Sequence, residues 1–144
     1  MNMKNSINFV HSEMNQNLSS PRIILPILFK YIKPTSVVDI GCGTGRFLRA
    51  FKEFGIDTIL GVDANWVYRE LFEENIAENK FHVTDLGKIS YKKLDRKFDL
   101  AVCIEVHGDI DQKYSDLIVE NLTSLNDYIL FCSNSLPGRT APCE

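Results

Sequence analysis

The sequence has little of what marks a secreted, membrane-spanning or metal-binding protein. No apolar run approaches the roughly 20 residues of a membrane helix, and the first residues lack a basic and apolar leader pattern. The four cysteines form no Cys-x-x-Cys pair and no cluster with histidine, which predicts buried reduced thiols and no metal site: Cys42, Cys103, Cys132 and Cys143. We therefore expect a cytoplasmic protein without membrane contact.

The sequence also lacks an excess of charge of either sign. Its 16 Lys and Arg residues and 19 Asp and Glu residues give a net charge of -3, whereas nucleic-acid-binding domains usually carry a basic surface. A nucleic-acid substrate is therefore not predicted. The 144 residues fit one domain with a single buried core, and 44% hydrophobic residues are typical of a globular chain.

Apolar runs of strand length alternate with stretches of helical periodicity. The runs cover residues 36–40, 57–62, 80–84, 98–104 and 127–132. Such alternation predicts an α/β fold, a parallel sheet with helices on both faces, and right-handed crossovers give the strand order 3-2-1-4-5. Two expected helical faces are Phe47, Phe51 and Phe54, and then Tyr114, Ile118, Leu122 and Leu125.

The most informative segment is Val37–Gly45, where an apolar run ends in three alternating glycines and a helical pattern follows. Glycine adopts positive φ and lets a ligand approach bare backbone, and α/β folds bind ligands at the carboxyl ends of their strands. In the nicotinamide and flavin pattern G-x-G-x-x-G the third glycine comes one residue later. The segment resembles the cofactor-binding turn of class I S-adenosylmethionine-dependent methyltransferases.

Three later segments are similar to further motifs of that family, in the expected order. Gly61–Ala64 resembles the end of the second strand, where the family holds the cofactor ribose, and Val83–Leu86 resembles the end of the third strand, which meets the adenine. Phe98–Val106 resembles the fourth strand, beneath the site of methyl transfer. The resemblance implies a Rossmann-like domain that binds S-adenosyl-L-methionine and methylates an acceptor, which we expect to be a small molecule.

The resemblance implies a role for three acids. Asp39 orients the ammonium group of the cofactor, Asp63 accepts both ribose hydroxyls, and Asp85 accepts from the adenine amine. Structural alternatives are that Asp39 accepts from the N–H groups of the glycine turn and that Asp85 is a helix N-cap; Asp63 would also suit the ribose of NAD. The implied cofactor-binding residues are Asp39, Gly41, Cys42, Gly43, Gly45, Asp63, Ala64, Asp85, Leu86 and Glu105.

The resemblance identifies no catalytic residue. Many relatives follow the fourth strand with a Glu-His pair, whereas this chain has Glu105 at the strand end and then His107, Gly108 and Asp109. His107 is the candidate general base, because the unperturbed pKa of histidine lies near neutrality. Its structural alternative is an ordinary surface residue.

Residues 1–19 are polar and aperiodic and are expected to form a flexible arm ahead of a domain at 20–144. Ser20 followed by Pro21 predicts a helix N-cap and a first-turn proline, and Pro26 predicts a kink in that helix. The apolar face expected for the helix comprises Ile23, Ile24, Ile27, Leu28 and Tyr31.

The segment Ser133–Glu144 is rich in turn residues and shorter than the antiparallel sixth and seventh strands with which the family usually continues. We expect a sheet without those strands, whose open fifth-strand edge favours self-association and whose site supports little turnover. One alternative function is a cofactor-binding module without turnover. Another is a NAD-dependent oxidoreductase, which does not explain the glycine spacing or Asp85-Leu86.

Overall fold

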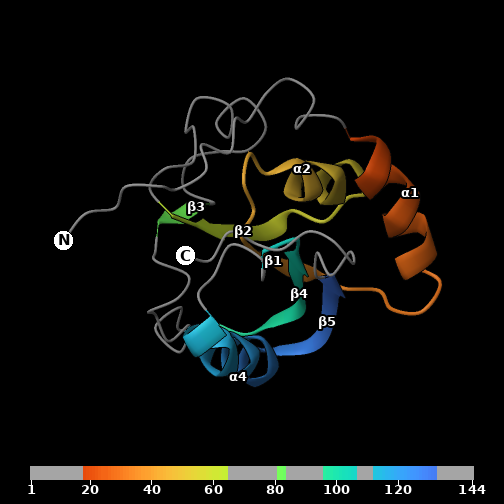
Figure 1. Cartoon of the computed structure of the whole chain (residues 1–144). Helices are drawn as coiled ribbons and strands as arrows, with labels where there is room; N and C mark the ends of the chain where they lie inside the picture. Colours follow the sequence, from red (N-terminus) through yellow and green to blue (C-terminus); the bar gives the residue numbers. More distant parts are fainter. Residues whose placement is uncertain (1–17, 65–80, 84–95, 107–111, 133–144) are drawn as a thin grey trace, which may run out of the picture.

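A computed structural model of the chain describes residues 18–64, 81–83, 96–106 and 112–132. The strands of this described part form one sheet in the order β3-β2-β1-β4-β5 (Figure 1), and every adjacent pair is parallel. The predicted α/β fold with a parallel, Rossmann-like sheet is therefore confirmed. In chain order the elements are α1 (Ser19–Leu28), β1 (Ser36–Ile40), α2 (Arg46–Glu53), β2 (Thr58–Asp63), β3 (Phe81–Val83), β4 (Phe98–Ile104), a 3-10 turn (Gln112–Tyr114), α4 (Ser115–Leu125) and β5 (Asn126–Cys132).

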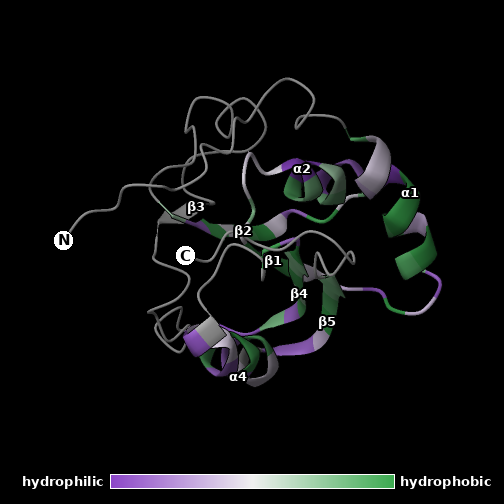
Figure 2. Ribbon diagram, viewed as in Figure 1, coloured by the Kyte–Doolittle hydropathy of each residue, from purple (hydrophilic) through white to green (hydrophobic). Residues whose placement is uncertain are grey.

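The middle strands are apolar because both faces of the sheet are covered. All residues of β1 are buried, and in β4 only Asp99 and Ile104 are partly accessible. Parallel strands that are buried on both faces have continuous apolar runs instead of an alternating pattern. Figure 2 shows hydrophobic residues along the middle of the sheet, which explains why the strands are the best-predicted elements.

The core is divided in two by the sheet. Figure 1 shows α1 and α2 on one face and α4 on the other. Leu25 of α1 and Phe51 of α2 pack in the same cluster as Val37 of β1, whereas Ile118 of α4 packs in a second cluster with Val38. Successive residues of a strand point to opposite faces, so the neighbours Val37 and Val38 belong to different halves of the core.

Hydrogen bonds of Asp99 connect two strands at the amino-terminal edge of the sheet, opposite the edge where ligands bind in such folds. Its Oδ2 accepts hydrogen bonds from the Thr35 hydroxyl over 2.7 Å, from the Thr35 N–H over 2.6 Å and from the Ser36 N–H over 3.1 Å. The Asp99 N–H donates in turn to the Ser36 hydroxyl over 2.9 Å. These bonds, led by the Thr35 hydroxyl, hold the pKa of Asp99 below its usual value. The starts of β1 and β4 are thereby joined.

The start of α1 differs from its prediction. Ser20 is not the N-cap: the helix begins at Ser19, its N-cap residue is Leu18, and no side chain caps it. The Arg22 N–H makes the first helical hydrogen bond, to Leu18 O over 3.0 Å. Pro21 tolerates its place in the helix because N–H groups of the first turn have no helical partner. Pro26 lies inside the helix, and its predicted kink stays a prediction.

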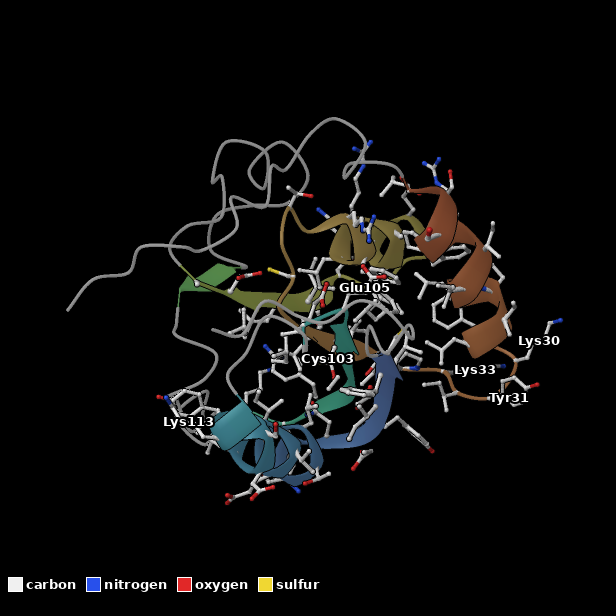
Figure 3. The ribbon with its side chains drawn as sticks, in the orientation of Figure 1. Lys30, Tyr31, Lys33, Cys103, Glu105 and Lys113 are labelled. Atoms are coloured by element: carbon white, nitrogen blue, oxygen red, sulfur yellow. The ribbon has the colours of Figure 1, made fainter. Side chains whose placement is uncertain are left out.

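The buried face of α1 is also rotated from the expected one. Leu25 is fully buried, and Arg22 fixes the helix against α2 through two 2.9 Å hydrogen bonds, from its Nε and Nη2 to the two carboxylate oxygens of Glu53. Ile24 and Leu28 pack against the core as expected. The expectation is wrong for Ile23, Ile27 and Tyr31, which are 65%, 52% and 82% exposed. Figure 3 shows Tyr31 projecting outward beyond the end of α1.

The predicted face of α2 is buried only in part. Phe47 and Phe51 are buried, but Phe54 is 44% exposed. The helix ends at Glu53, so Phe54 leaves the helical face and packs edge to face on Phe29, with ring centroids 5.4 Å apart. The predictions for Ile118 and Leu122 of α4 are confirmed, since both are buried.

β5 is the edge strand of the sheet, and most of its side chains are exposed. Cys132 is exposed, so its prediction as a buried thiol is wrong, whereas Cys42 and Cys103 are buried as predicted. The difference follows from position, because the sequence pattern of an apolar strand does not distinguish a central strand from an edge strand. Cys143 lies outside the described residues.

Two predictions about the chain ends concern residues that the structure does not describe. The flexible arm is predicted for residues 1–19, of which 1–17 are not described, while Leu18 is buried and Ser19 begins α1; the absence of a sixth and seventh strand concerns residues 133–144. Both stay predictions. Among the described residues, no helix is long and apolar enough to cross a membrane, and no group of acidic, histidine and cysteine side chains could hold a metal ion.

Candidate cofactor-binding site

The glycine turn lies between β1 and α2, at the carboxyl ends of the strands. Gly41, Gly43 and Gly45 have φ values of 77°, 52° and 79°, a region that residues with a side chain rarely adopt. The N–H groups of Gly41 and Cys42 both donate to Val62 O, over 2.7 Å and 3.3 Å. The end of β2 therefore holds the start of the turn, and Gly45 serves as the N-cap residue of α2.

Asp63, the last residue of β2, holds the middle of the same turn. Its Oδ2 accepts a hydrogen bond from the Gly43 N–H over 2.7 Å, and its Oδ1 accepts one from the Ala64 N–H over 2.7 Å. The residue is only 2% exposed. The sequence assigned a turn-holding alternative to Asp39, but in the structure Asp63 makes this contact.

Asp39 is a second buried acid close to the turn, with 4% of its surface exposed. In the sheet it is aligned with Gly61 of β2 and Val102 of β4. Burial raises the pKa of Asp39 to about 8, the negative charge of Asp63 adds to the rise, and the positive charge of Arg46 opposes it. Asp39 is therefore mostly protonated at neutral pH, and a nearby cation would favour its ionised form.

The two thiols near these acids are unreactive. Burial raises the pKa of Cys42 well above its usual value and that of Cys103 to about 12, and the negative charge of Asp39 adds to both. The thiolate is the nucleophilic form of cysteine. Neither residue therefore serves as a nucleophile near neutral pH, and Cys42 contributes through its backbone.

The residue directly after β4 is left-handed and brings the chain against the glycine turn. Glu105 has a φ of 59°, which no other non-glycine residue of the described segments matches in sign. Its N–H donates to Cys132 O of β5 over 2.9 Å, and its side chain is exposed. Figure 3 shows it close to Cys103 at the end of β4. The next residue, Val106, is buried, and a Cβ placed on Gly41 would collide with its Cγ2.

The structure thus places most of the predicted site residues at the carboxyl ends of β1, β2 and β4: Asp39, Gly41, Cys42, Gly43, Gly45, Asp63, Ala64 and Glu105. Asp85, Leu86 and His107 lie outside the described residues. Sequence reasoning missed Val106, whose apolar side chain directly after a strand end was the available signal. It also missed Arg46, the cation next to the third glycine, which lowers the pKa of Asp39.

A family of proteins described as "Methyltransferase domain" has a sequence model that matches residues 10–132 of this chain. The match covers more than half of the chain. It includes α1, the glycine turn, both buried acids and all strands from β1 to β5.

The chain is similar to longer curated proteins. The ribosomal protein L11 methyltransferase of Caldicellulosiruptor saccharolyticus is 30% identical over 118 residues, which are 81% of this chain and 38% of that protein. The ribosomal protein L11 methyltransferase of Thermosipho africanus is 36% identical over 76 residues, which are 52% of this chain and 29% of that protein. The chain therefore spans about a third of the length of these relatives.

Solved structures share the fold at low sequence identity. A Burkholderia thailandensis protein of the O-methyltransferase family is 13% identical, with a TM-score of 0.53 over 74% of this chain and 35% of that chain. A glycopeptide N-methyltransferase complexed with S-adenosyl-L-homocysteine is 14% identical, with a TM-score of 0.59 over 74% of this chain and 47% of that chain.

Proposed function

The chain belongs to the methyltransferase domain family of class I S-adenosylmethionine-dependent methyltransferases, and we propose that it binds S-adenosyl-L-methionine and transfers its methyl group to an acceptor. The observation that carries the proposal is the pair of buried acids, Asp39 and Asp63, beside a turn of three positive-φ glycines. One of these acids is hydrogen-bonded to the turn itself. This arrangement supports a site for an adenosine that carries an amino acid.

The chemistry of the two acids fits the two ends of that ligand. Asp39 is buried and mostly protonated, and an ammonium group beside it would stabilise its carboxylate. Asp63 has a carboxylate with about four acceptor positions, enough for two ribose hydroxyls beside the N–H groups of Gly43 and Ala64. We assign the amino-acid end to Asp39 and the ribose to Asp63.

When bound, the cofactor would supply an activated methyl group, which passes directly to the acceptor as S-adenosyl-L-homocysteine leaves, so that no covalent enzyme intermediate is needed. The task left to the protein is to hold and orient the cofactor and the acceptor and to exclude water from the site. Catalysis of this kind is an effect of proximity and orientation. In our proposal the glycine turn and the two acids do the holding, and Asp85 and Leu86 contact the adenine. We propose that the exposed carboxylate of Glu105 faces the cofactor sulfonium or holds the acceptor, and that His107 is the candidate general base.

Titration calorimetry with S-adenosyl-L-homocysteine, S-adenosylmethionine and NAD tests the cofactor. We expect both sulfur ligands to bind and NAD to give no heat of binding. NAD binding without a response to either sulfur ligand would support the oxidoreductase alternative and contradict the proposal. Binding of the sulfur ligands without transfer to any acceptor would favour the alternative of a binding module.

The acceptor has two candidates. The first is the small molecule expected from the sequence analysis, where the lack of a basic excess argues against a nucleic-acid acceptor. The names of the relatives favour ribosomal protein L11 as the second candidate. Transfer of a radiolabelled methyl group separates them: purified L11 and a small-molecule extract are offered separately, and the Asp39→Ala variant serves as the inactive control. Label in L11 alone would contradict the small-molecule acceptor.

We further propose that the chain self-associates through β5 and acts in the cytoplasm. β5 pairs with β4 on one side, and its exposed apolar residues are Tyr128, Ile129 and Phe131, at 53%, 39% and 48%. An edge strand with apolar side chains is a template for pairing with another strand. Fractionation of cells that express the protein tests the proposed cytoplasmic location.

A further inference from the structure

Val106 fills the space above the first glycine of the turn. A Cβ built on Gly41 would collide with Cγ2 of Val106, and it would lie 3.1 Å from its Cγ1 and 3.2 Å from its Cβ. The side chain is 7% exposed and belongs to the same core cluster as Val38 and Ile118. The absence of a side chain at Gly41 therefore makes room for a valine of the same chain.

The backbone of Glu105 directs Val106 to this place. With a φ of 59°, Glu105 adopts a left-handed conformation that residues with a side chain rarely take. Its N–H is held by Cys132 O of β5. Strain of this kind persists only where the surrounding structure holds it, and the contact that it permits is the one between Val106 and the glycine turn.

We propose that Val106 is a positioning residue for the cofactor site, which holds the glycine turn in its binding conformation by packing on Gly41. The turn is thereby fixed from two sides, by Asp63 and Val62 from β2 and by Val106 from the end of β4. This inference rests on the proposed function, because the ligand of the turn is the proposed cofactor. It adds a residue that touches neither the cofactor nor the acceptor in our assignment.

The test compares Val106→Ala with Val38→Ala by calorimetric titration of S-adenosyl-L-homocysteine and by thermal melts. Both changes remove the same two methyl groups from one core cluster, so both should lower Tm. We expect Val106→Ala to weaken binding at least about tenfold, which is about 1.4 kcal/mol, and Val38→Ala to leave it within about twofold. Val106→Thr, which keeps both γ positions, should restore most of the affinity. Equal affinities in all three variants and the wild type would overturn the proposal.

A double-mutant cycle tests the contact itself. Gly41→Ala introduces the colliding Cβ, and Val106→Ala removes the two γ carbons that lie nearest to it, so the double variant should have a higher Tm than Gly41→Ala alone. Additive losses of Tm would show that the two residues do not interact. The cycle needs no ligand. It therefore stays informative if the wild type fails to bind S-adenosyl-L-homocysteine, a result that would overturn the proposed function instead.

Two variants at position 105 test whether the left-handed backbone of Glu105 positions the site. Glu105→Gly and Glu105→Val both remove the carboxylate, but glycine accepts positive φ and a β-branched residue does not. We expect Glu105→Val to bind S-adenosyl-L-homocysteine at least about fivefold more weakly than Glu105→Gly and to melt at a lower temperature. Equal affinity of the two variants would show that the left-handed backbone does not position the site.

Discussion

The carboxylate of Asp63 is bonded to the glycine turn that follows the neighbouring strand: its Oδ2 lies 2.7 Å from the Gly43 nitrogen. Asp63 ends β2 and Gly43 lies in the turn after β1, so the bond fixes the distance between the ends of these two strands. An acid that would contact the ribose thus also sets the shape of the loop that would contact the rest of the ligand. Binding and local stability are therefore coupled at Asp63.

We expect Asp63→Ala to weaken binding of S-adenosyl-L-homocysteine at least about tenfold, because a lost hydrogen bond to a charged group costs about 1.5–3 kcal/mol. The loss should exceed that of Asp85→Ala, for which one hydrogen bond to the adenine is proposed. Both variants should still fold, although Asp63→Ala also frees the N–H groups of Gly43 and Ala64 and should melt at a lower temperature. Calorimetry and thermal melts measure the two effects.

The matched control for Asp63→Ala is Asp57→Ala, which removes an exposed acid just before β2. This variant should have wild-type affinity and nearly wild-type Tm. Unchanged affinity in Asp63→Ala would remove Asp63 from the proposed site, whatever its effect on Tm.

The stability of the protein should depend on pH because the pKa of Asp39 is raised in the folded state. An acid with a raised native pKa favours the folded state most below its unfolded pKa of about 3.9, and the contribution is lost as the pH rises toward the native value of about 8. One pKa unit is about 1.4 kcal/mol, so the loss is on the order of several kcal/mol. Asp39→Asn, which stays neutral, should gain Tm over the wild type as the pH rises from 5 to about 8.5. A constant difference would contradict the raised pKa.

The same acid predicts that binding releases a proton. If the ammonium of the cofactor lies beside Asp39, binding favours the carboxylate and must expel the proton that the ligand-free protein holds near neutral pH. Affinity should then increase with pH up to about 8. Calorimetry at pH 7 in two buffers of different ionisation enthalpy measures the proton directly, and Asp39→Asn should bind more weakly without release. Equal heats in both buffers for the wild type would place the ammonium elsewhere.

The sequence predicted the strands well because the central strands are buried on both faces. The bounds predicted for β1 and β4 agree with the observed Ser36–Ile40 and Phe98–Ile104, where a continuous apolar run is the direct consequence of cover on both sides. The residues at the ends of these strands follow from topology. Asp39 and Asp63 could therefore be brought to one edge of the sheet before any coordinates were known.

The buried face of α1 and the contacts of individual side chains could not be predicted in the same way. The α1 sequence from Ile23 to Leu28 is apolar at every position, so periodicity cannot choose the buried face, and the ion pair of Arg22 with Glu53 of α2 is a tertiary contact. The sequence also could not show that Asp63, and not Asp39, holds the glycine turn, because the hydrogen bond from the Gly43 N–H to Asp63 depends on the local path of the turn. The position of Val106 depends on the left-handed backbone of Glu105, which sequence propensities do not predict.

The hydrogen bonds that Asp99 accepts at the amino-terminal edge of the sheet should weaken in acid. Asp99 accepts three hydrogen bonds as a carboxylate, and its pKa is lowered. Its contribution is therefore present above the unfolded value of about 3.9 and is lost as the pH falls through the native value. Asp99→Asn should lower Tm at pH 7 by a few degrees, and by less near pH 3. Asp116→Asn, in the first turn of α4, is the control acid at a helix start. Equal effects of Asp99→Asn at both pH values would contradict the assignment.

Self-association through β5 is tested with lysine, a residue that disfavours strand pairing at an exposed edge. Tyr128 is 53% exposed on β5 and Val119 is 55% exposed on α4, so a lysine at either place removes a similar apolar surface with little loss of packing. Only Tyr128→Lys places a charge on β5, the outermost of the described strands on that side of the sheet. We expect the wild type and Val119→Lys to form dimers or larger species in sizing chromatography as their concentration increases, and Tyr128→Lys to stay monomeric. A wild-type monomer at all concentrations would contradict the edge proposal, and dimers that persist in Tyr128→Lys would place the interface elsewhere.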